Sequence, residues 1–524
     1  RVGLLHAMQR LAVRRLSSAV SSGRPGARRA AADEMADAAA AMEDKKGSWQ
    51  KLMGGVVNAV RPACAALHPV LQPLLDAPAQ RRVEAAVNIE DLRVAAKARA
   101  HAMVFGYLKS GADEERALRR SVAAYNDVEL RHACLHGIGH ADLDLSTRIL
   151  GVEAALPFFI TSCAGQRMFH AEGEVATAKA ARKHGLMMAL SQLTTSTFEE
   201  VTAAHPGDEP GTGGAKCLQL YVWRDRVLLK EVLDRAKAAG FTSLALTADF
   251  SWVGNREEDT RTGFTVPPNY SFRQTVDALK APAWTFDFMS RVPYGYKAVP
   301  GADFAAESLV DFIASQMKPE FNWKDAEWLC SEWGDTGPVA LKGVARTTDA
   351  KRAIDTGFQA IWVSNHGGRQ LEDSVATIDS LPEIREAVGE GTEVILDGGV
   401  RRGIDVVKAL ARGADSVAIG RAYLFGLAAG GQRGVEKAIE LLTRDVYLAM
   451  GLLGCRTVAE LKQKAPEILV VNGASARMSA GAVLQPELRA ASGGDLLAAA
   501  RAAGRRGARC RRRADVAPRS PNPC

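Results

Sequence analysis

The chain has 524 residues, of which 47% are hydrophobic and 24% charged, so its composition is that of a globular protein longer than one minimal domain. Its eight cysteines are scattered without a C-x-x-C pair, which argues against a zinc ribbon or a disulfide framework and favours a reducing compartment. The formal charge of +7 comes from the ends: residues 1–30 and 489–524 carry +7 each, which leaves 7 − 14 = −7 for residues 31–488 and argues against nucleic-acid binding.

The two ends of the chain differ in composition from its middle. Residues 8–31 are rich in Arg, Ser and Ala and contain no acid, which is typical of a transit peptide. We therefore expect residues 1–31 to direct the protein to the mitochondrion; the alternatives are a plastid leader or an untargeted arm of a cytoplasmic protein. Residues 32–87 are predicted to be a partly helical, alanine-rich extension of unassigned role. Residues 466–524 are predicted to form a basic, largely disordered tail without a Ser-Lys-Leu peroxisomal signal.

Eight short apolar runs recur through the middle of the chain. They are near-continuously apolar, as parallel strands covered on both faces should be. Helical patterns lie between most of them, and several end at a glycine just before the next run, namely Gly185, Gly240, Gly357 and Gly413. Eight β–α units predict an α/β protein with a closed (β/α)8 TIM barrel, whose chemistry lies at the carboxyl ends of its strands. The runs are residues 157–163, 186–191, 217–222, 243–249, 338–343, 360–365, 393–399 and 416–421.

A long insertion interrupts this repeat after the fourth run. The starts of neighbouring runs are 22 to 33 residues apart, except for a gap of 95 residues between 243 and 338. We therefore place an insertion at about residues 251–336, on a loop that leaves the catalytic end of the barrel. It contains the aromatic stretch PAWTFDFMSRVPYGY (282–296). Packing over the barrel is the interpretation we favour, and docking to a membrane or an electron acceptor is the alternative. The chain contains no run of about 18 apolar residues, so no membrane-spanning helix is predicted.

Polar side chains follow all eight predicted strands. The last two strands end in DGGVRRG and IGR, and glycines with arginines after strands seven and eight form the usual phosphate site of such barrels. The amide and hydroxyl groups nearby suit the edge of a flavin ring, and Lys342 supplies positive charge for its reduced form. The residues that we expect at the cofactor are Ala164, Ser191, Gln219, Tyr221, Thr247, Lys342, Asp397, Gly398, Gly399, Arg401, Gly420 and Arg421.

The stretch SNHGGRQLE (364–372) follows the sixth run and contains the candidate base. Two glycines let the chain turn sharply, and they hold His366 and Arg369 at the carboxyl end of a strand. His366 is the natural proton acceptor, and Asp249 can stabilise its imidazolium form. Arg369, together with Arg256 from the insertion, can bind a carboxylate.

These residues belong to motifs that closely resemble the FMN-dependent L-2-hydroxy-acid dehydrogenases and oxidases, a family that includes glycolate oxidase, L-lactate dehydrogenase and flavocytochrome b2. The motifs are SNHGGRQLE, LQLYVWRDR, LKGV, HAEGEVATAKAA and DGGVRRGIDVVKALARGADSVAIGRAYLF, and the resemblance covers about residues 88–465. It implies bound FMN, a homotetramer and the oxidation of a 2-hydroxy acid to a 2-keto acid. In that reaction His366 takes the hydroxyl proton and Tyr107 and Tyr221 hydrogen-bond the substrate.

The resemblance also bears on the substrate and the electron acceptor. Leu193 stands where glycolate oxidases have tryptophan, and its smaller side chain leaves space for the methyl group of L-lactate. The stretch 281–295 looks more like the lactate and mandelate dehydrogenases than the oxidases, while oxygen, a quinone and cytochrome c all stay open as acceptors. The alternative activity is a glycolate-type oxidase that makes hydrogen peroxide. From another class, a catalytically silent flavin-binding scaffold is the third hypothesis.

Three motifs are set aside. HACLHGIGH (132–140) spaces three histidines four apart, but VELRHACL (128–135) is predicted to be a strand and the glycines break any helix, so no metal site is predicted. GTGGAK (211–216) precedes a strand instead of following one, so we predict a surface turn and not a phosphate loop. HPVL (68–71) lacks the glycines of a cytochrome b5 haem motif, so residues 32–87 are not expected to bind haem.

Overall fold

Eight apolar segments form the parallel strands of one closed barrel in the computed structural model of this chain. The pairing order is β4-β5-β6-β7-β8-β9-β10-β11, and β11 returns to β4. The predicted barrel and its eight strands are confirmed. The strands are β4 (Phe158–Ile160), β5 (Met187–Ser191), β6 (Gly214–Tyr221), β7 (Ser243–Thr247), β8 (Val339–Val344), β9 (Ala360–Val363), β10 (Glu393–Asp397) and β11 (Ser416–Ile419). The structure describes residues 25–207, 211–265, 271–290, 295–299, 316–472 and 474–475.

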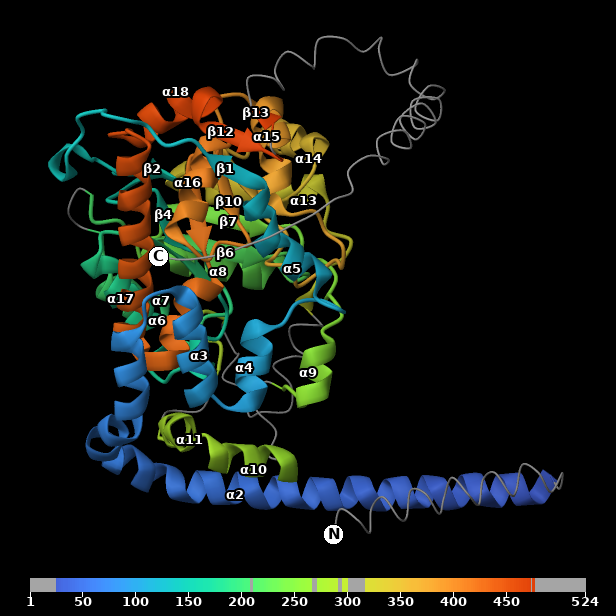
Figure 1. Cartoon of the computed structure of the whole chain (residues 1–524). Coiled ribbons are helices and arrows are strands. Elements are labelled where there is room, and N and C mark those ends of the chain that lie inside the picture. Colours follow the sequence, from blue (N-terminus) through green and yellow to red (C-terminus); the bar gives the residue numbers. More distant parts are fainter. Residues whose placement is uncertain are drawn as a thin grey trace, which may run out of the picture.

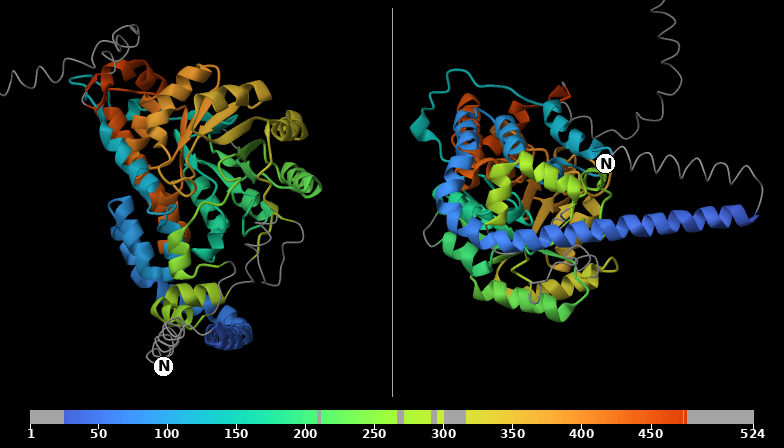
Figure 2. Two further views of the ribbon diagram at one scale, coloured as in Figure 1. Left: turned by 90° about the vertical axis from the view of Figure 1, so that its right-hand side faces the viewer. Right: turned by 90° about the horizontal axis from the view of Figure 1, so that it is seen from below.

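The strands are buried on both faces, as their continuous apolar runs predict. Inside the barrel, alanines such as Ala245 and Ala340 leave room for two large rings. Phe159 and Trp362 fill it, edge to face, with their ring centroids 5.2 Å apart. Outside, the strands pack against a layer of helices that surrounds them in both views of Figure 2. The barrel interior is therefore a packed core, and only its ends are available for chemistry.

The outer helices follow the strands in the expected alternation. Gly185, Gly240, Gly357 and Gly413 follow the last turns of α6, α8, α14 and α16 with positive φ, so the predicted helix ends are confirmed. The helices of this layer are α6 (Gly173–Lys183), α7 (Phe198–Ala204), α8 (Arg226–Ala238), α13 (Trp323–Trp333), α14 (Thr347–Thr356), α15 (Thr377–Val388), α16 (Gly403–Ala411), α17 (Arg421–Leu452) and α18 (Val458–Ile468).

Helices before the barrel and in the insertion gather at its catalytic end. The first group is α2 (Pro25–Ala85), α3 (Ile89–Arg99), α4 (Ala102–Lys109) and α5 (Arg116–Ala123), and the second is α9 (Glu257–Thr262), α10 (Phe272–Lys280) and α11 (Pro282–Met289). Figure 1 shows α10 and α11 beside α2, which runs beneath the molecule and then bends upward. Four prolines inside α2 remove backbone donors, so they permit such a bend. α2 also begins within the expected transit peptide and passes its boundary at residue 31 without a break.

Small sheets lie outside the barrel, and one of them corrects the predicted tail. β1 (Val128–Leu130) pairs with β12 (Leu469–Val471), which pairs with β13 (Ala474–Ser475). Residues 469–471 are thus ordered because they find a strand partner far earlier in the chain, which the basic composition of the tail conceals. The tail from residue 476 onward lies outside the described residues. A second pair, β2 (Thr147–Ile149) and β3 (Val152–Ala154), packs into the barrel core.

Two further expectations need correction. β6 begins at Gly214, because Met187 pairs with that residue, so half of GTGGAK is strand and not surface turn. The strand expected across VELRHACL ends at Leu130, where its pairing with β12 stops. Among the described residues, no group of three His, Cys, Asp or Glu side chains could hold a metal ion. The described helices include none with the length and apolar character needed to cross a bilayer.

We expect the stability of the fold to depend on the ionisation of Glu393, which lies at the start of β10. Burial raises the pKa of this carboxyl to about 7, although it accepts hydrogen bonds of 3.0 and 3.1 Å from the backbone N–H of Leu150. The unfolded chain loses this proton at lower pH than the native state, so the free energy of unfolding falls as pH rises through that interval. A Glu393→Gln variant should lack this slope and exceed the wild type by up to about 3 kcal/mol above pH 7, measured by urea unfolding.

Glu390, which is exposed just before this strand, provides the control. A Glu390→Gln variant should follow the wild-type pH dependence. Parallel curves for the wild type and the Glu393→Gln variant would contradict the assignment.

Candidate active site

The turn after β9 carries the candidate base in a left-handed backbone conformation. His366, Gly367 and Gly368 have φ values of 54°, 66° and 71°. A Cβ at Gly367 would lie 2.9 Å from Arg421 Nη1, and one at Gly368 would lie 2.6 Å from the backbone N of Leu118. Side chains larger than glycine would crowd these neighbouring groups, and both positions have the positive φ that glycine tolerates best. His366 is held in a conformation that few non-glycine residues adopt, as is common at functional sites.

His366 and Asp249 form the pair that the sequence predicts. The ring Nδ1 lies 2.8 Å from Asp249 Oδ1, and the two side chains are 17% and 14% exposed. Burial alone would raise the pKa of Asp249, but the charge and hydrogen bond of His366, with Lys342 nearby, hold it below its ordinary value. A carboxylate that accepts the Nδ1 proton leaves Nε2 as the basic nitrogen of the ring. The pair can therefore take up a proton and stabilise the resulting cation.

Two arginines meet at the ring of Tyr107. Arg369 Nη1 donates to the carbonyls of Tyr107 at 2.8 Å and Ser110 at 2.9 Å. The guanidinium carbons of Arg369 and Arg256 lie 4.5 and 6.0 Å from the centre of the Tyr107 ring. Burial and the neighbouring charge of Arg369 lower the pKa of Arg256. The sequence predicted this pair of cations, and the fold brings them to the side of the site where Tyr107 lies.

Part of each guanidinium has no hydrogen-bond partner within the described part of the chain. Arg369 Nη2 and Arg256 Nε are both buried, and neither donates to a protein group. Leaving a buried charged donor unpaired is costly, so these atoms are fitted to an anion that the site receives. A carboxylate matches the fork geometry of arginine.

Lys342 and Asp397 form a buried ion pair across the barrel end. Lys342 Nζ lies 2.8 Å from Asp397 Oδ2 and 2.8 Å from Ser364 Oγ. Asp397 also accepts hydrogen bonds from Ser364 Oγ at 2.7 Å and from Trp362 Nε1 at 3.0 Å. Burial opposes the charge of Lys342, but Asp397 and Asp249 raise its pKa, so it stays cationic. Asp397, expected to hold the cofactor chain, thus serves first as the counter-ion of Lys342.

Three polar side chains, those of Ser191, Gln219 and Thr247, lie at or near the carboxyl ends of β5, β6 and β7. Gln219 Nε2 donates to Thr247 Oγ1 at 2.8 Å, and Ser191 Oγ accepts from the backbone N of Leu193 at 3.2 Å. Tyr221 is 8% exposed, and burial raises the pKa of its hydroxyl, which therefore stays protonated. Leu193 is 6% exposed, while Ala164, in the loop after β4, is half-buried. The structure thus gathers these predicted residues at one end of the barrel.

The ends of β10 and β11 supply glycines and two cations without a salt-bridge partner among the described residues. Arg421 begins α17 after Gly420 and donates to the carbonyls of Leu108, Ser110 and Gly367 at 3.1, 2.7 and 2.8 Å. Those bonds use three of its five N–H groups, which leaves two for an anion. Burial lowers the pKa of Arg421 and of Arg401, which follows Gly398 and Gly399. Uncompensated cations at a helix N-terminus are fitted to a phosphate.

Several residues of this end were not singled out from the sequence. Trp362 was taken as strand core, although its indole N–H reaches Asp397. Ser364 lies within the quoted motif, and its position beside His366 was the available signal. Phe264 stacks on Tyr107 with centroids 4.2 Å apart, and Gln370 Oε1 lies 3.4 Å from Arg256 Nη2. Phe264 carries no local signal, because its contact depends on how the insertion folds back.

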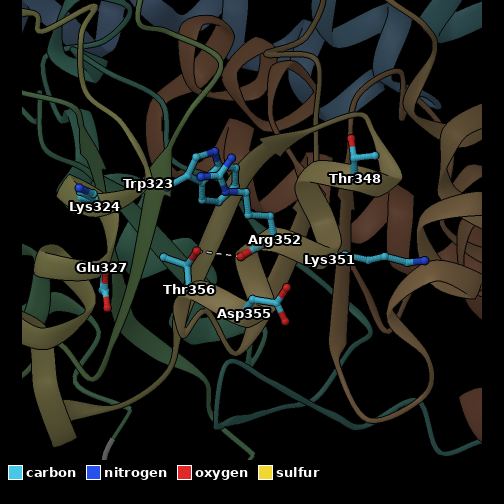
Figure 3. A pocket seen from close by; sticks show the side chains of 8 residues that line it. All are labelled: Trp323, Lys324, Glu327, Thr348, Lys351, Arg352, Asp355 and Thr356. Atoms are coloured by element: carbon cyan, nitrogen blue, oxygen red, sulfur yellow. Dashed lines mark hydrogen bonds between the residues drawn. The ribbon is translucent and has the colours of Figure 1, made fainter.

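A surface hollow of about 640 Å³ lies away from these residues, between α13 and α14 (Figure 3). Its charged side chains are exposed and of mixed sign: Lys324, Lys351 and Arg352 are positive, and Glu327 and Asp355 are negative. Arg352 stacks over the Trp323 ring at 4.9 Å. Side chains that are already solvated or stacked lack the unpaired buried donors found at the barrel end, so we place the active site at the latter.

This chain resembles known proteins over more than two thirds of its length. A family profile described as FMN-dependent dehydrogenase matches residues 96–467. An L-lactate oxidase from a Nostoc species is 39% identical over 381 residues, which cover 72% of this chain and 97% of that protein. The 2-hydroxyacid oxidase 1 of Homo sapiens is 37% identical over 373 residues, or 71% of this chain and 94% of that protein.

Solved structures share the fold. One is the monotopic membrane protein (S)-mandelate dehydrogenase, with a TM-score of 0.67 and 29% identity, over 74% of this chain and 99% of that chain. Another is a mandelate oxidase, with a TM-score of 0.61 and 34% identity, over the same shares of the two chains.

The ion pair between Lys342 and Asp397 gives a stability prediction. In a Lys342→Met variant the Asp397 carboxylate would stay buried without its counter-ion, so the free energy of unfolding should fall by about 3 kcal/mol or more. Urea unfolding measures the change. The double variant Lys342→Met/Asp397→Asn removes both charges and should recover part of the loss. Equal stability of the single variant and the wild type would show that the pair does not have this role.

Proposed function

The chain belongs to the FMN-dependent dehydrogenase family, and from that premise we propose that it oxidises a short L-2-hydroxy acid, above all L-lactate, to the 2-keto acid. The observation that carries the proposal is the juxtaposition of the His366–Asp249 pair with two partly unpaired guanidiniums. The base accounts for removal of a hydroxyl proton. The guanidiniums account for recognition of the carboxylate next to that hydroxyl.

FMN, the cofactor of the family, fits the residues at the barrel end. Gln219, Thr247, Ser191 and Ala164 offer the amide, hydroxyl and small groups that suit the ring, and Lys342 offers a fixed positive charge. Arg401 and Arg421, with the glycines at 398, 399 and 420, would hold the ribityl chain and phosphate alongside Asp397. When bound, FMN supplies the acceptor for the hydride that leaves the substrate α-carbon.

The protein groups would act on the substrate in a definite order. Arg256 and Arg369 bind the carboxylate through their unpaired N–H groups, which fixes the α-carbon in place. The hydroxyls of Tyr221 and Tyr107 hydrogen-bond the substrate and orient it. His366 Nε2 takes the hydroxyl proton, and Asp249 stabilises the imidazolium through the 2.8 Å contact at Nδ1. Since the pair is largely buried, its charges act in a medium that screens them weakly.

Leu193 supports L-lactate over glycolate. Its side chain is buried at the end of β5, next to the cofactor residue Ser191. A side chain of this size leaves space for a methyl group on the α-carbon, whereas a tryptophan would fill it. The relative named as an L-lactate oxidase supports the same substrate class.

Anaerobic mixing of the FMN-loaded protein with L-lactate, glycolate and L-mandelate tests this function. L-Lactate should bleach the flavin absorbance fastest, because its methyl group suits the space beside Leu193. A His366→Gln variant should keep FMN but reduce it at least about a hundredfold more slowly, since proton removal is lost. If none of the three acids bleaches the flavin, the enzymatic proposal fails and a flavin-binding scaffold becomes the better explanation.

The electron acceptor is a separate proposal. The stretch 281–295, which resembles the dehydrogenases, supports an acceptor other than oxygen. The second candidate, an oxidase that makes hydrogen peroxide, is favoured by the similarity to an L-lactate oxidase and to 2-hydroxyacid oxidase 1. With L-lactate in air, we expect turnover with an artificial dye to exceed peroxide formation. Peroxide produced in equal amount to pyruvate, at the dye-supported rate, would instead establish the oxidase.

The proposal also extends to location and assembly. The Arg- and Ser-rich composition of residues 8–31 supports a mitochondrial location. Family membership supports a homotetramer.

A further inference from the structure

A buried charged cluster joins the N-terminal helix α2 to the insertion helix α11. At its centre Asp287, on α11, is 1% exposed. Its carboxylate accepts hydrogen bonds from His68 Nε2 at 3.0 Å, Arg99 Nη2 at 2.9 Å and the backbone N of Ala171 at 3.1 Å. These three donors come from α2, from α3 and from the loop after β4. One carboxylate therefore holds together four segments that are distant in the sequence.

α2 makes a second set of contacts in the same cluster. Gln72 Nε2 donates to Asp76 Oδ2 at 2.9 Å and to the carbonyl of Ala283, in α11, at 3.1 Å. Asp76 Oδ1 in turn lies 2.7 Å from Arg99 Nε, and the Arg99 side chain is fully buried. His68, Gln72 and Asp76 are spaced four residues apart, so they lie on one face of α2. His68 and Gln72 on this face contact α11, and Asp76 contacts Arg99 of α3.

Strong interactions hold the charges of this cluster in place. Burial would raise the pKa of Asp287, but His170, the hydrogen bond from His68 and the charge of Arg99 outweigh it and hold the pKa well below its ordinary range. His170 Nδ1 lies 3.9 Å from Asp287 and 3.8 Å from Glu172. Buried ion clusters are rarely the most stable way to fill a core, since apolar residues of similar volume do as well or better. Their directional contacts do fix geometry.

The cluster reaches the substrate side of the active site through the loop after β4. Arg99 Nη1 lies 3.5 Å from the carbonyl of Phe169, and Trp284 of α11 donates from Nε1 to the carbonyl of Met168 at 2.8 Å. The ring of Phe169 stacks on that of Tyr107, with centroids 6.3 Å apart. Tyr107 lies beneath Arg369 and accepts a hydrogen bond from it through its carbonyl. A continuous line of contacts thus runs from α2 to the carboxylate-binding arginine.

α2 lies before the segment that the family profile matches, which begins at residue 96. His68, Gln72 and Asp76 are therefore contributed by the extension of this chain, whereas Arg99 and Asp287 lie inside the matched segment. The extension, whose role the sequence does not assign, supplies two of the side chains that hydrogen-bond α11, His68 and Gln72.

We propose that Asp287 is a positioning residue for substrate binding, and that α2 of the N-terminal extension holds it in place through His68 and Gln72. The inference rests on the proposed function, because it concerns the site for the substrate carboxylate. We call the contacts of His68 and Gln72 with α11 the clamp. The clamp fixes α11 and the loop of residues 168–171, and these set the position of the Tyr107 ring and of Arg369. It does not touch the His366–Asp249 pair, so it affects binding of the hydroxy acid and not proton transfer.

The test compares two variants of the full-length, FMN-loaded protein with the wild type. His68→Ala/Gln72→Ala removes the contacts from α2, and we expect the KM for L-lactate to rise about tenfold, with kcat within about twofold of the wild type. Acetate, a carboxylate without the reacting hydroxyl, should bind more weakly by the same factor, and its Kd is measured from the flavin absorbance. Hydrogen–deuterium exchange of residues 282–289 should become faster. Asp287→Asn, which keeps the size of the side chain, should give a similar split between KM and kcat.

Two controls separate positioning from a general loss of structure. His68→Gln, with Gln72 kept, retains a donor that can reach Asp287 and should leave KM, Kd and exchange near the wild-type values. Gln80→Ala removes a hydrogen bond from α2 to the carbonyl of Gly430, away from α11, and should leave all three unchanged.

The outcomes distinguish the two proposals. If residues 282–289 exchange faster in His68→Ala/Gln72→Ala while KM and Kd stay at wild-type values, α2 holds α11 but the positioning role is wrong. If exchange also stays unchanged, there is no clamp. If the wild-type protein is not reduced by any hydroxy acid, the proposed function fails, and acetate binding together with exchange still decides whether the clamp shapes an anion site.

Discussion

The pairing of β11 with β4 is the constraint on which the active site depends. Val417 pairs with Phe158 and Ile419 with Ile160, and these contacts join the last strand of the barrel to the first. Without closure, the glycines and arginines after β10 and β11 would not share a rim with Ser191, Gln219 and Thr247. Because all eight strands are parallel, closure brings every carboxyl end to the same side. These groups thus become neighbours although Ser191 and Arg421 are 421 − 191 = 230 residues apart in the sequence.

The rim concentrates positive charge that the protein itself neutralises only in part. Lys342 has Asp397 as a counter-ion, whereas Arg256, Arg369, Arg401 and Arg421 contact carbonyls and aromatic rings. Burial lowers the pKa of three of these arginines, which shows that the fold bears an electrostatic cost at this end. Anionic ligands relieve that cost. In the proposed function, a phosphate at the ends of β10 and β11 and a carboxylate between Arg256 and Arg369 would account for the two groups of cations.

The regions added to the barrel are coupled to each other as well as to the core. The insertion helix α11 binds α2 through Asp287 and Ala283, and it binds the loop after β4 through Trp284. The insertion therefore packs over the catalytic end, which agrees with the interpretation favoured from its aromatic content. Extension and insertion are separated by some 200 residues, yet each completes the burial of polar groups on the other.

The sequence by itself determined the class of fold, the residue types at the rim and the family. Eight apolar runs with glycine-ended helices between them predict a barrel from local periodicity alone. Motifs such as SNHGGRQLE indicate the family from the sequence alone. Only the tertiary structure decided that Asp397 neutralises Lys342, that Arg421 binds three carbonyls, that residues 469–471 form a strand and that α2 clamps Asp287. The physical reason is range. The burial of an apolar run can be predicted from the run itself. A buried ion pair depends on partners such as His68 and Asp287, which are 219 residues apart and meet only when the chain has folded.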